Sequence, residues 1–329
     1  MKLLILGGTG FLSRHLAAAA LAAGHQVTCA SRGVSGRPPA GCRFVRWDRK
    51  DAAPAALAGA RFDVVVDVLG QPSHVRRALQ GLHAGHWIFI STLNVYADPR
   101  AGDAAGPDER LVPAIGQDVS IDSPQSYGGM KVGCEQLVAA HAPSFTILRP
   151  GLIIGPGDRT GRFSYWPLRL AAAAADGHPF IAPEPRDDPV QFIDARDLAD
   201  WILLLADGRR QLVCDAVGPV MTRAQFIDRL AATLGPPAPA VRWLSPEQLA
   251  AHRIEPWSGP RSLPLWLPAQ LTALMDRDHA PARRAGLRVR PVADSARSVL
   301  GAGAETAAPT GLSRAEELRI LGVPGPGPR

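Results

Sequence analysis

A tyrosine and a lysine in the middle of the chain, Tyr127 and Lys131, have the spacing of an acid/base pair. Side chains four residues apart lie on the same face of a helix, so a phenol and an ammonium would point into one site. The chain contains only three tyrosines and three lysines, and arginine supplies nearly all of its positive charge. The alternative is an ordinary amphipathic helix in which this spacing carries no chemistry, and the surrounding elements must decide.

A glycine-rich turn near the start of the chain predicts a nucleotide site. Residues 2–6 form an apolar run typical of a buried parallel strand, Gly7-Gly8-Thr9-Gly10 follows at once, and a helical pattern covers residues 11–23. Gly7 permits the tight turn, and Gly10 lets the backbone approach a pyrophosphate at the helix N-terminus. Ser13 replaces the third glycine of the usual spacing, which weakens the motif without cancelling it. The alternative is a purely structural glycine turn.

The residues after the second strand predict which dinucleotide binds. Residues 26–30 are expected to form this strand, and Ser31-Arg32 follows it. A site for NAD usually has a carboxylate here for the ribose 2′-hydroxyl, whereas the 2′-phosphate of NADP requires donors and positive charge. Arg32, with Arg14 from the glycine turn, therefore favours NADP(H) over NAD(H), and Asp48 is positioned to meet the adenine. The alternative is that Arg32 is solvated or stacks on adenine.

Strands and helices alternate through the first half of the chain. Further strands are expected at residues 43–45, 62–68, 86–90 and 145–149, and helices at 53–58, 74–82 and 127–140. Most of these strands are continuously apolar, which is typical of a parallel sheet covered on both faces. We therefore predict an α/β protein with a Rossmann doubly wound parallel sheet. Later in the chain, we expect 191–193 to return to this sheet, a strand at 211–215, and helices at 196–205, 222–234 and 313–321.

A hydroxyl-rich segment that includes Thr92 and Asn94 follows the strand at residues 86–90. Open α/β sheets bind their ligands at the C-terminal ends of the strands. This segment is therefore a candidate for contact with a ligand. The polar loop at 99–124, which contains proline and glycine, is expected to border the same cleft.

With these residues assembled, the sequence resembles the extended short-chain dehydrogenases/reductases of the NAD-dependent epimerase/dehydratase family. Five segments match in the family's order and cover residues 1 to about 205: G-G-T-G-F-L-S, S-T-L-N-V-Y, Y-G-G-M-K, L-R-P-G-L-I-I-G-P-G-D and Q-F-I-D-A-R-D-L-A. Three later segments are similar to bacterial oxidoreductases commonly labelled 2′-hydroxyisoflavone reductase-like: R-F-S-Y-W-P-L-R, W-S-G-P-R-S-L-P-L-W-L-P and G-L-R-V-R-P. That label is poor evidence for the substrate.

The resemblance implies catalytic roles for three residues. Thr92 resembles the residue that hydrogen-bonds the substrate oxygen, Tyr127 the proton-transferring phenol, and Lys131 the group that lowers the phenol pKa and contacts the nicotinamide ribose. Lowering a phenol pKa from near 10 to about 7 requires roughly 4 kcal/mol of differential stabilisation, which an ammonium and an oxidised nicotinamide can supply. The motif and the resemblance together predict a cofactor site formed by Gly7, Thr9, Gly10, Phe11, Leu12, Arg14, Ser31, Arg32, Asp48, Val68, Leu69, Gly70, Lys131 and Pro150.

The sequence departs from the family at one informative position. Sugar-nucleotide dehydratases have Asp-Glu directly after the catalytic threonine, whereas Leu93-Asn94 follow Thr92 here. We therefore disfavour dehydration. The lack of a carboxylate after the second strand argues mildly against an epimerase, because epimerases generally retain NAD.

The regular alternation ends near residue 152, which predicts two domains. We expect an NADP-binding Rossmann domain over residues 1–150 with returning segments at about 190–216, and a substrate-binding lobe over about 151–189 and 217–329. The predicted substrate-binding residues are Thr92, Asn94, Arg162, Tyr165, Trp166 and Trp257. The alternative for Tyr165 and Trp166 is packing at the start of a helix, and the segment around Trp257 either roofs the pocket or forms a small core.

Composition limits the classes of partner. The chain has 329 residues and a net charge of +6, without a dense basic block of the kind that binds nucleic acid. Its four cysteines form no C-x-x-C pair, its nine histidines show no metal-ligand spacing, and no apolar run is long enough to span a bilayer. We expect a cytoplasmic protein that binds a small molecule, without metal, nucleic acid or membrane; a homodimer is suggested by family habit only.

Three functions follow as hypotheses. The first is an NADPH-dependent carbonyl reductase, or the reverse alcohol dehydrogenase, acting on a small or medium organic substrate, for which secondary metabolism is one setting. The second is a sugar-nucleotide-type epimerase that retains NAD. The third is a redox sensor or RNA-binding protein that uses the fold without catalysis, against which the trio Thr92, Tyr127 and Lys131 argues.

Overall fold

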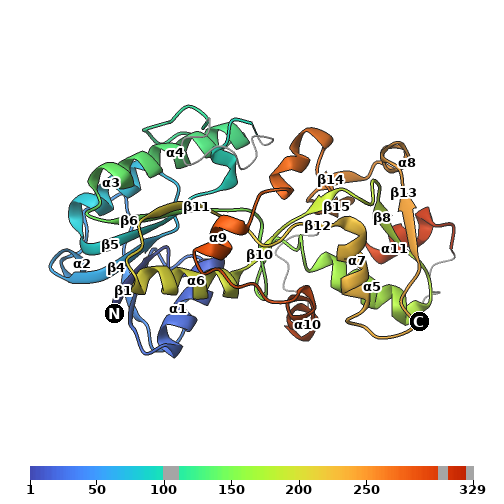
Figure 1. The fold of residues 1–329 in the computed structure, drawn as a ribbon, viewed down its shortest axis with the longest axis horizontal. Helices are drawn as coiled ribbons and strands as arrows, with labels where there is room; N and C mark the ends of the chain where they lie inside the picture. The colour runs from blue at the N-terminus through green and yellow to red at the C-terminus, as the bar shows by residue number, and fades with distance from the viewer. Residues whose placement is uncertain (99–110, 303–309, 324–329) are drawn as a thin grey trace. The chain divides into compact units, whose positions relative to one another are not determined.

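The chain divides into two compact units in the computed structural model, which describes residues 1–98, 111–302 and 310–323. The first unit comprises Met1–Ile153, Ala195–Gly218 and Arg277–Arg288, and the second comprises Ile154–Asp194, Pro219–Asp276 and Val289–Arg329 (Figure 1). Two segments differ from the predicted domain boundaries. Residues 277–288, assigned to the substrate lobe from sequence, belong to the first unit, and residues 190–194 belong to the second.

A seven-stranded parallel sheet forms the centre of the first unit, in the order β11-β6-β5-β4-β1-β2-β3. The strands are β1 (Lys2–Leu6), β2 (Gln26–Ser31), β3 (Arg43–Arg46), β4 (Arg61–Asp67), β5 (His83–Ile90), β6 (Phe145–Pro150) and β11 (Leu212–Ala216). The strand order reverses direction at β1, between β2 and β4, as in a doubly wound sheet. The predicted Rossmann fold is confirmed.

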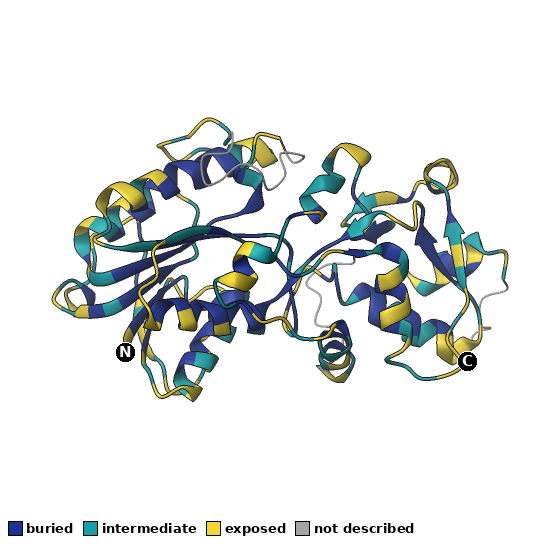
Figure 2. Cartoon of the chain, viewed as in Figure 1, coloured by how far each residue is buried: buried dark blue, intermediate teal, exposed yellow. Residues whose placement is uncertain are grey.

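Helices cover both faces of this sheet, as the apolar strands require (Figure 1). On one face α1 (Phe11–Ala22) packs against α6 (Ala195–Asp207), and on the other α3 (Pro72–Gly81) packs against α4 (Pro124–His141). Shorter elements of this unit are α2 (Ala55–Ala58), α9 (Ala280–Arg284) and the 3-10 helix η1 (Leu93–Val95). Figure 2 shows the central strands of the sheet as largely buried and the outer faces of the helices as exposed, whereas the edge strand β3 is mostly exposed.

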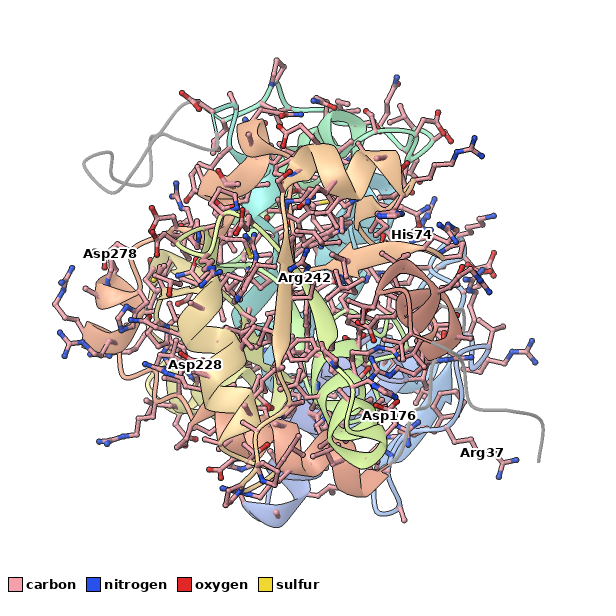
Figure 3. All side chains as sticks on the ribbon, turned by 90° about the vertical axis from the view of Figure 1, so that its right-hand side faces the viewer. Arg37, His74, Asp176, Asp228, Arg242 and Asp278 are labelled. Carbon is pink, nitrogen blue, oxygen red and sulfur yellow. The ribbon has the colours of Figure 1, made fainter. Side chains whose placement is uncertain are left out.

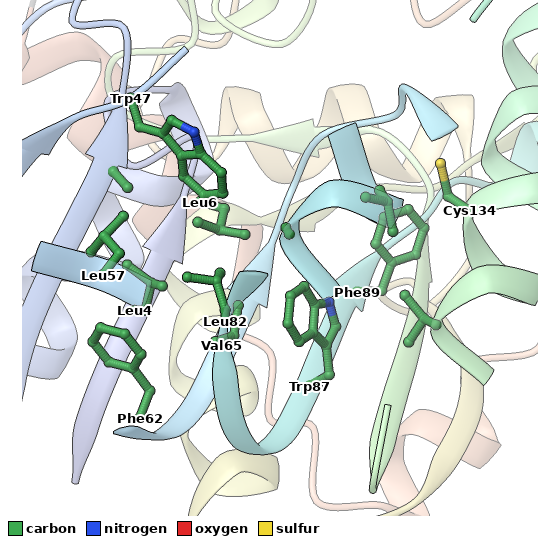
Figure 4. Close-up of a cluster of buried hydrophobic side chains, with 14 of the residues drawn as sticks. Leu4, Leu6, Trp47, Leu57, Phe62, Val65, Leu82, Trp87, Phe89 and Cys134 are labelled. Carbon is green, nitrogen blue, oxygen red and sulfur yellow. The ribbon is translucent and has the colours of Figure 1, made fainter. Parts of the chain in front are cut away.

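The core between the sheet and the pair α3 and α4 contains alternate residues of β1 and of β5 (Figure 4). Leu4 and Leu6 of β1 and Trp87 and Phe89 of β5 lie in this cluster, because residues two apart in a strand point to the same face. Full burial of each such side chain contributes about 1.5–3 kcal/mol. This core fixes the strand ends that carry the candidate site.

Helix α4 begins three residues earlier than the sequence prediction. Ser123 caps it and forms a reciprocal capping box with Ser126, and Pro124 occupies the first turn. Both signals are present in the sequence, since serine is a preferred N-cap and proline is tolerated at the first helical position. Tyr127 therefore lies inside the first turn of the helix, where it is held by the cap.

The second unit consists of helices and two-stranded pairs. Its strand pairs are β7 (Ile153–Ile154) with β10 (Ile193–Asp194), β8 (Phe180–Pro183) with β13 (Val241–Leu244), β9 (Pro189–Val190) with β12 (Met221–Thr222), and β14 (Glu255–Trp257) with β15 (Ser262–Pro264). Its helices are α5 (Tyr165–Asp176), α7 (Arg223–Ala231), α8 (Pro246–Ala251), η2 (Ala269–Met275), α10 (Val292–Ala302) and α11 (Arg314–Ile320).

One strand prediction in this region is wrong. Residues 191–193 were expected to return to the main sheet, but β10 contains only Ile193 and Asp194 and pairs with β7. The reason is that α6 starts at Ala195, directly after β10, which leaves no length for a sheet strand. The predicted cap of α7 is confirmed, since Thr222 accepts a hydrogen bond from the amide of Gln225.

Candidate active site

Tyr127 and Thr92 are brought together at the C-terminal end of β5, where the Thr92 side chain is near enough to the phenol to lower its pKa. Thr92 is the N-cap of η1, and its Oγ1 accepts a hydrogen bond of 3.3 Å from the amide of Asn94. The first turn of α4 packs directly on η1, because a Cβ atom at Gly128 would overlap the carbonyl oxygen of Asn94. A glycine beside Tyr127 therefore sets the approach of the phenol to the threonine.

Lys131 is buried, with 2% of its side chain exposed, and its ammonium is bound by backbone carbonyls. Nζ donates to the carbonyl oxygens of Ile90 at 2.6 Å, Leu69 at 3.2 Å and Val68 at 3.5 Å. It also lies 4.8 Å from the centroid of the Phe89 ring. Burial lowers the pKa of Lys131 to about 8. The lysine thus connects the ends of β4 and β5.

The structure differs from the expectation that Lys131 lowers the pKa of Tyr127. Burial raises the pKa of the phenol, the hydrogen bond with Thr92 opposes this, and Cys134 adds to it. The physical reason is that three carbonyl oxygens hold the Lys131 ammonium, as described above. Tyr127 is therefore a neutral phenol at pH 7.

The glycine turn has the shape of a pyrophosphate cradle. Gly7 has a φ of +80°, and a Cβ atom there would lie 2.8 Å from Cγ2 of Val68; at Gly8 it would lie 2.6 Å from Cβ of Cys29. Gly10 is the N-cap of α1 and provides no side-chain cap, so the first amides of the helix are available to an anion. The Oγ atoms of Ser13 and Ser91 are buried without a hydrogen-bond partner in the described parts of the chain. These residues fit a dinucleotide.

The other predicted cofactor residues surround this turn or the end of the sheet. Thr9 Oγ1 lies 3.2 Å from Ser31 Oγ, and a Cβ atom at Gly70 would lie 2.9 Å from Cε of Lys131. Leu12 and Pro150 are buried, whereas Arg14 and Arg32 are exposed, and the ring of Phe11 contacts that of His15. The amide of Lys50 lowers the pKa of Asp48, and the charge of Arg32 adds to this effect.

The predicted substrate residues of the second unit separate into two groups. Arg162 and Trp257 meet, with the guanidinium carbon 4.6 Å from the ring centroid. Trp166 is buried and donates its indole hydrogen to the Pro264 carbonyl at 3.0 Å, and the ring of Tyr165 is buried beneath Gly311. The structure therefore corrects the prediction for Tyr165 and Trp166, since both side chains pack in the core of the unit.

Sequence reasoning missed a buried ion pair at the end of β4. Arg49 donates to both carboxylate oxygens of Asp67, at 2.7 and 2.8 Å, and the two side chains are 4% and 0% exposed. Asp67 also accepts a hydrogen bond from the amide of Leu69, whose carbonyl binds Lys131. A signal existed, because Asp67 ends an otherwise apolar strand at the ligand edge of the sheet.

A second missed network surrounds Tyr96, just after η1. The Tyr96 hydroxyl donates to Asp215 at 2.6 Å and accepts from Arg149 at 3.1 Å. Arg149 also forms two hydrogen bonds with Glu135, and Arg277 pairs with Asp215 while lying 4.1 Å from the centroid of the Tyr96 ring. The only hint in the sequence was that Glu135 follows Lys131 by one helical turn.

The described residues offer neither a metal site nor a membrane-spanning helix. Within residues 1–98, 111–302 and 310–323, no three His, Cys, Asp or Glu side chains are grouped as metal ligands. Over the same ranges, no helix has the length and hydropathy needed to cross a membrane. Figure 3 shows acidic and basic side chains interspersed on the second unit, with Asp176, Asp228 and Arg242 labelled.

Comparison with known proteins gives two curated relatives of low identity. One is a dTDP-6-deoxy-L-talose 4-dehydrogenase (NAD(P)(+)) from Kitasatospora kifunensis, 25% identical over 72% of this chain and 80% of its own. The other is the mitochondrial NADH dehydrogenase [ubiquinone] 1 alpha subcomplex subunit 9 from Dictyostelium discoideum, 24% identical over 69% of this chain. The chain spans only 62% of the length of this second relative.

A solved structure and a family model extend the comparison. The structure of a Burkholderia cenocepacia J2315 protein shares the fold, with a TM-score of 0.65, 21% identity, and coverage of 92% of this chain and 97% of that one. The model of the NAD dependent epimerase/dehydratase family matches residues 3–214. The chain therefore belongs to the NAD-dependent epimerase/dehydratase family of extended short-chain dehydrogenases/reductases.

Proposed function

We propose that the protein is an NADPH-dependent reductase of a carbonyl group on a small or medium organic substrate, or the corresponding alcohol dehydrogenase in reverse. The proximity of the Tyr127 and Thr92 side chains, which the packing of Gly128 on Asn94 imposes, is the observation that carries this proposal. Two hydroxyl groups at one point can bind a single carbonyl oxygen, with Thr92 holding it and Tyr127 giving it a proton. In this scheme Asn94 serves mainly to orient Thr92 through its amide.

The protonation state of Tyr127 favours reduction over oxidation. Burial raises the pKa of the phenol, so the hydroxyl is protonated at neutral pH. Reduction of a carbonyl requires a proton donor at the oxygen, whereas oxidation of an alcohol requires a base there. A neutral phenol is the donor that reduction requires.

The cofactor is proposed to be NADP(H) in preference to NAD(H). Arg14, in the first turn of α1, and Arg32, directly after β2, are exposed, and β2 ends in Ser31 without a carboxylate. Arginine suits a phosphate because its planar fork can donate two parallel hydrogen bonds. NADPH, when bound, supplies the hydride. The uncapped amides of α1 would hold its pyrophosphate.

Lys131 is proposed to order the floor of the cofactor site and to contact the nicotinamide ribose. It donates to carbonyls of Val68 and Leu69, two of the predicted cofactor residues. A buried ammonium surrounded by carbonyl oxygens fixes the loop after β4 relative to the end of β5. This placement supports a structural and electrostatic role for the lysine beside the proton-donating phenol.

An epimerase that retains NAD is the alternative function. The description of the matching family includes epimerases, and the Kitasatospora relative acts on a dTDP-linked sugar by its name. Against it stands the lack of a carboxylate after β2. A non-catalytic role is the other alternative, since the Dictyostelium relative is named as a subunit of a larger dehydrogenase.

The test is NADPH oxidation with a panel of carbonyl compounds, including aryl ketones and dTDP-linked keto sugars. We expect NADPH consumption with one class, and a Tyr127→Phe variant that binds NADPH with unchanged affinity but turns over about a hundredfold more slowly or worse. Equal rates for the two proteins would refute the role of Tyr127. Tightly bound NAD in the purified protein, with no net consumption of added coenzyme, would favour the epimerase.

A further inference from the structure

Arg162 in the second unit has no direct ion pair with an acidic residue of the described chain. The other arginines of this unit that are not exposed each have a carboxylate oxygen within 4.0 Å in the described structure: Arg169, Arg223, Arg261, Arg290 and Arg314. No carboxylate of the described residues lies within that distance of the Arg162 guanidinium. The charge of Asp158 acts on Arg162 only from beyond ion-pair distance, and burial lowers the pKa of the guanidinium. A partly desolvated cation without a direct ion pair is suited to a ligand that supplies the negative charge.

The guanidinium of Arg162 is oriented with its terminal nitrogens free. Nε donates to Oγ1 of Thr160 at 3.1 Å, and Thr160 in turn donates its amide and its hydroxyl to the two oxygens of Asp158, both at 2.9 Å. Asp158 therefore orients Thr160 and leaves Arg162 without a direct ion pair. The two terminal nitrogens carry four hydrogens that have no acceptor among the described residues. They form one edge of a planar fork, which matches the oxygens of a phosphate or carboxylate.

Trp257 covers the flat face of this guanidinium. The distance of 4.6 Å between the guanidinium carbon and the ring centroid is that of a stacked cation–π pair. Trp257 has a φ of +74°, a left-handed conformation that a bulky residue rarely adopts. Such strained positions persist only where the surrounding structure holds them, and they are concentrated at ligand-binding sites.

We propose that Arg162 and Trp257 form an oxyanion site that binds the phosphate or carboxylate group of an anionic ligand. That this ligand is the substrate rests on the proposed function, whereas the site itself rests on the contacts of the second unit. The fork of Arg162 can donate hydrogen bonds to two oxygens in its plane, and Trp257 keeps that plane fixed. Lysine could not replace Arg162, because a single ammonium cannot make the paired contact.

The experiment is calorimetric titration of the full chain with inorganic pyrophosphate and, separately, with malonate, which distinguishes phosphate from carboxylate. The variant is Arg162→Gln, and the matched control is Arg159→Gln, because Arg159 lies on the same loop, is exposed, and carries the same charge. We expect R162Q to weaken binding of one anion by about tenfold to a hundredfold, and R159Q to weaken it by less than about threefold. Equal losses in the two variants, or no binding to the unmodified protein, would overturn the proposal.

Two further variants separate this proposal from others. Arg162→Lys keeps the charge but loses the fork, so we expect it to lose most of the anion affinity. This variant tests the site independently if R162Q does not fold. Tyr127→Phe should keep the anion affinity whatever its turnover. If anion binding depends on Arg162 but the protein oxidises no NADPH with any substrate, the reductase proposal is refuted and the anion site is supported. If the protein is an active reductase but anion binding does not depend on Arg162, the anion site is refuted and the reductase proposal is supported.

Discussion

Gly128 and Asn94 are in backbone contact, with no room for a side chain between α4 and η1. Because Tyr127 and Thr92 are the neighbours of this contact in the two elements, it controls how closely the phenol approaches the threonine. Replacing Gly128 with alanine must therefore push the two elements apart.

For Gly128→Ala we expect a loss of about 1–3 kcal/mol of stability from overpacking, together with a larger loss of kcat than of NADPH affinity. Thermal unfolding and steady-state kinetics measure these quantities. Gly116→Ala is the control, because no atom lies within 4 Å of a Cβ atom at that position. Unchanged kcat in G128A would show that the contact is not needed for the reaction.

The pH dependence of activity should reflect the titration of Lys131. Since burial lowers its pKa to about 8, the ammonium loses its charge as the pH rises through that value, and we expect kcat/KM to fall there. Arg stays charged, so the Lys131→Arg variant, at whatever rate it retains, should lack this limb between pH 6 and 10. If kcat/KM falls over the same pH range in both proteins, the fall belongs to the titration of another group. In the folding equilibrium the sign is opposite: the unfolded chain binds the extra proton between about pH 8 and 10.5, so stability rises over that window.

Acid should destabilise the protein through His86, which is buried between two hydroxyl groups. Its Nδ1 lies 2.8 Å from Oγ of Ser144 and its Nε2 lies 2.8 Å from Oγ1 of Thr146. Thr146 donates its own hydrogen to the Arg210 carbonyl, so Nε2 must be the protonated nitrogen and Nδ1 the acceptor. Burial lowers the pKa of His86 from 6.5 to about 4. A second proton would make Nδ1 the donor to Ser144 and would place a positive charge in a buried site near Arg209.

The unfolded chain therefore binds this proton first as the pH falls, and the stability that neutral His86 provides above pH 6.5 is lost between 6.5 and 4. The loss should amount to roughly 3 kcal/mol. Urea unfolding at pH 7 and pH 4.5 measures it. His86→Gln keeps a donor and an acceptor without titrating, so its stability should change less, whereas the exposed His252→Gln should behave as the unmodified protein. Identical pH slopes for all three would exclude His86 as the cause.

Removing one partner of the Arg49–Asp67 pair should cost far more stability than replacing both partners with apolar residues. Arg49→Met leaves a fully buried carboxylate without its partner, and we expect a loss of about 3–5 kcal/mol in urea unfolding. The double variant with Asp67→Leu should recover part of that loss. Arg186→Met, which removes an exposed pair with Glu184, should cost less than about 1 kcal/mol. If the double variant loses as much stability as the two single variants together, or more, this account is contradicted.

The sheet was predictable because its strands are apolar runs that are local in the sequence. Strands buried on both faces are typical of a parallel sheet covered by helices. The pair Tyr127 and Lys131 was visible for the same reason, since helical spacing is a local property. The acceptors of Lys131 were not visible, because carbonyl oxygens carry no residue identity and come from the ends of two different strands.

The roles of the aromatic residues in the second unit depend on tertiary packing, which the sequence does not show. Tyr165, Trp166 and Trp257 are equivalent candidates in the sequence, and only the tertiary contacts bury the first two and leave the third beside Arg162. The ion pairs of Asp67 and Asp215 were missed because their arginine partners are distant in the sequence.

The first unit is assembled from three separated stretches, the last of which ends at Arg288. That last stretch contributes Arg277 to Asp215 and the Ala285 carbonyl to the indole of Trp201. During synthesis on the ribosome, the nucleotide-binding sheet therefore waits for nearly the whole polypeptide before its final contacts can form. A nascent chain halted before residue 277 would carry Asp215 and Trp201 without these partners, which gives chaperones and proteases a longer interval in which to act on it.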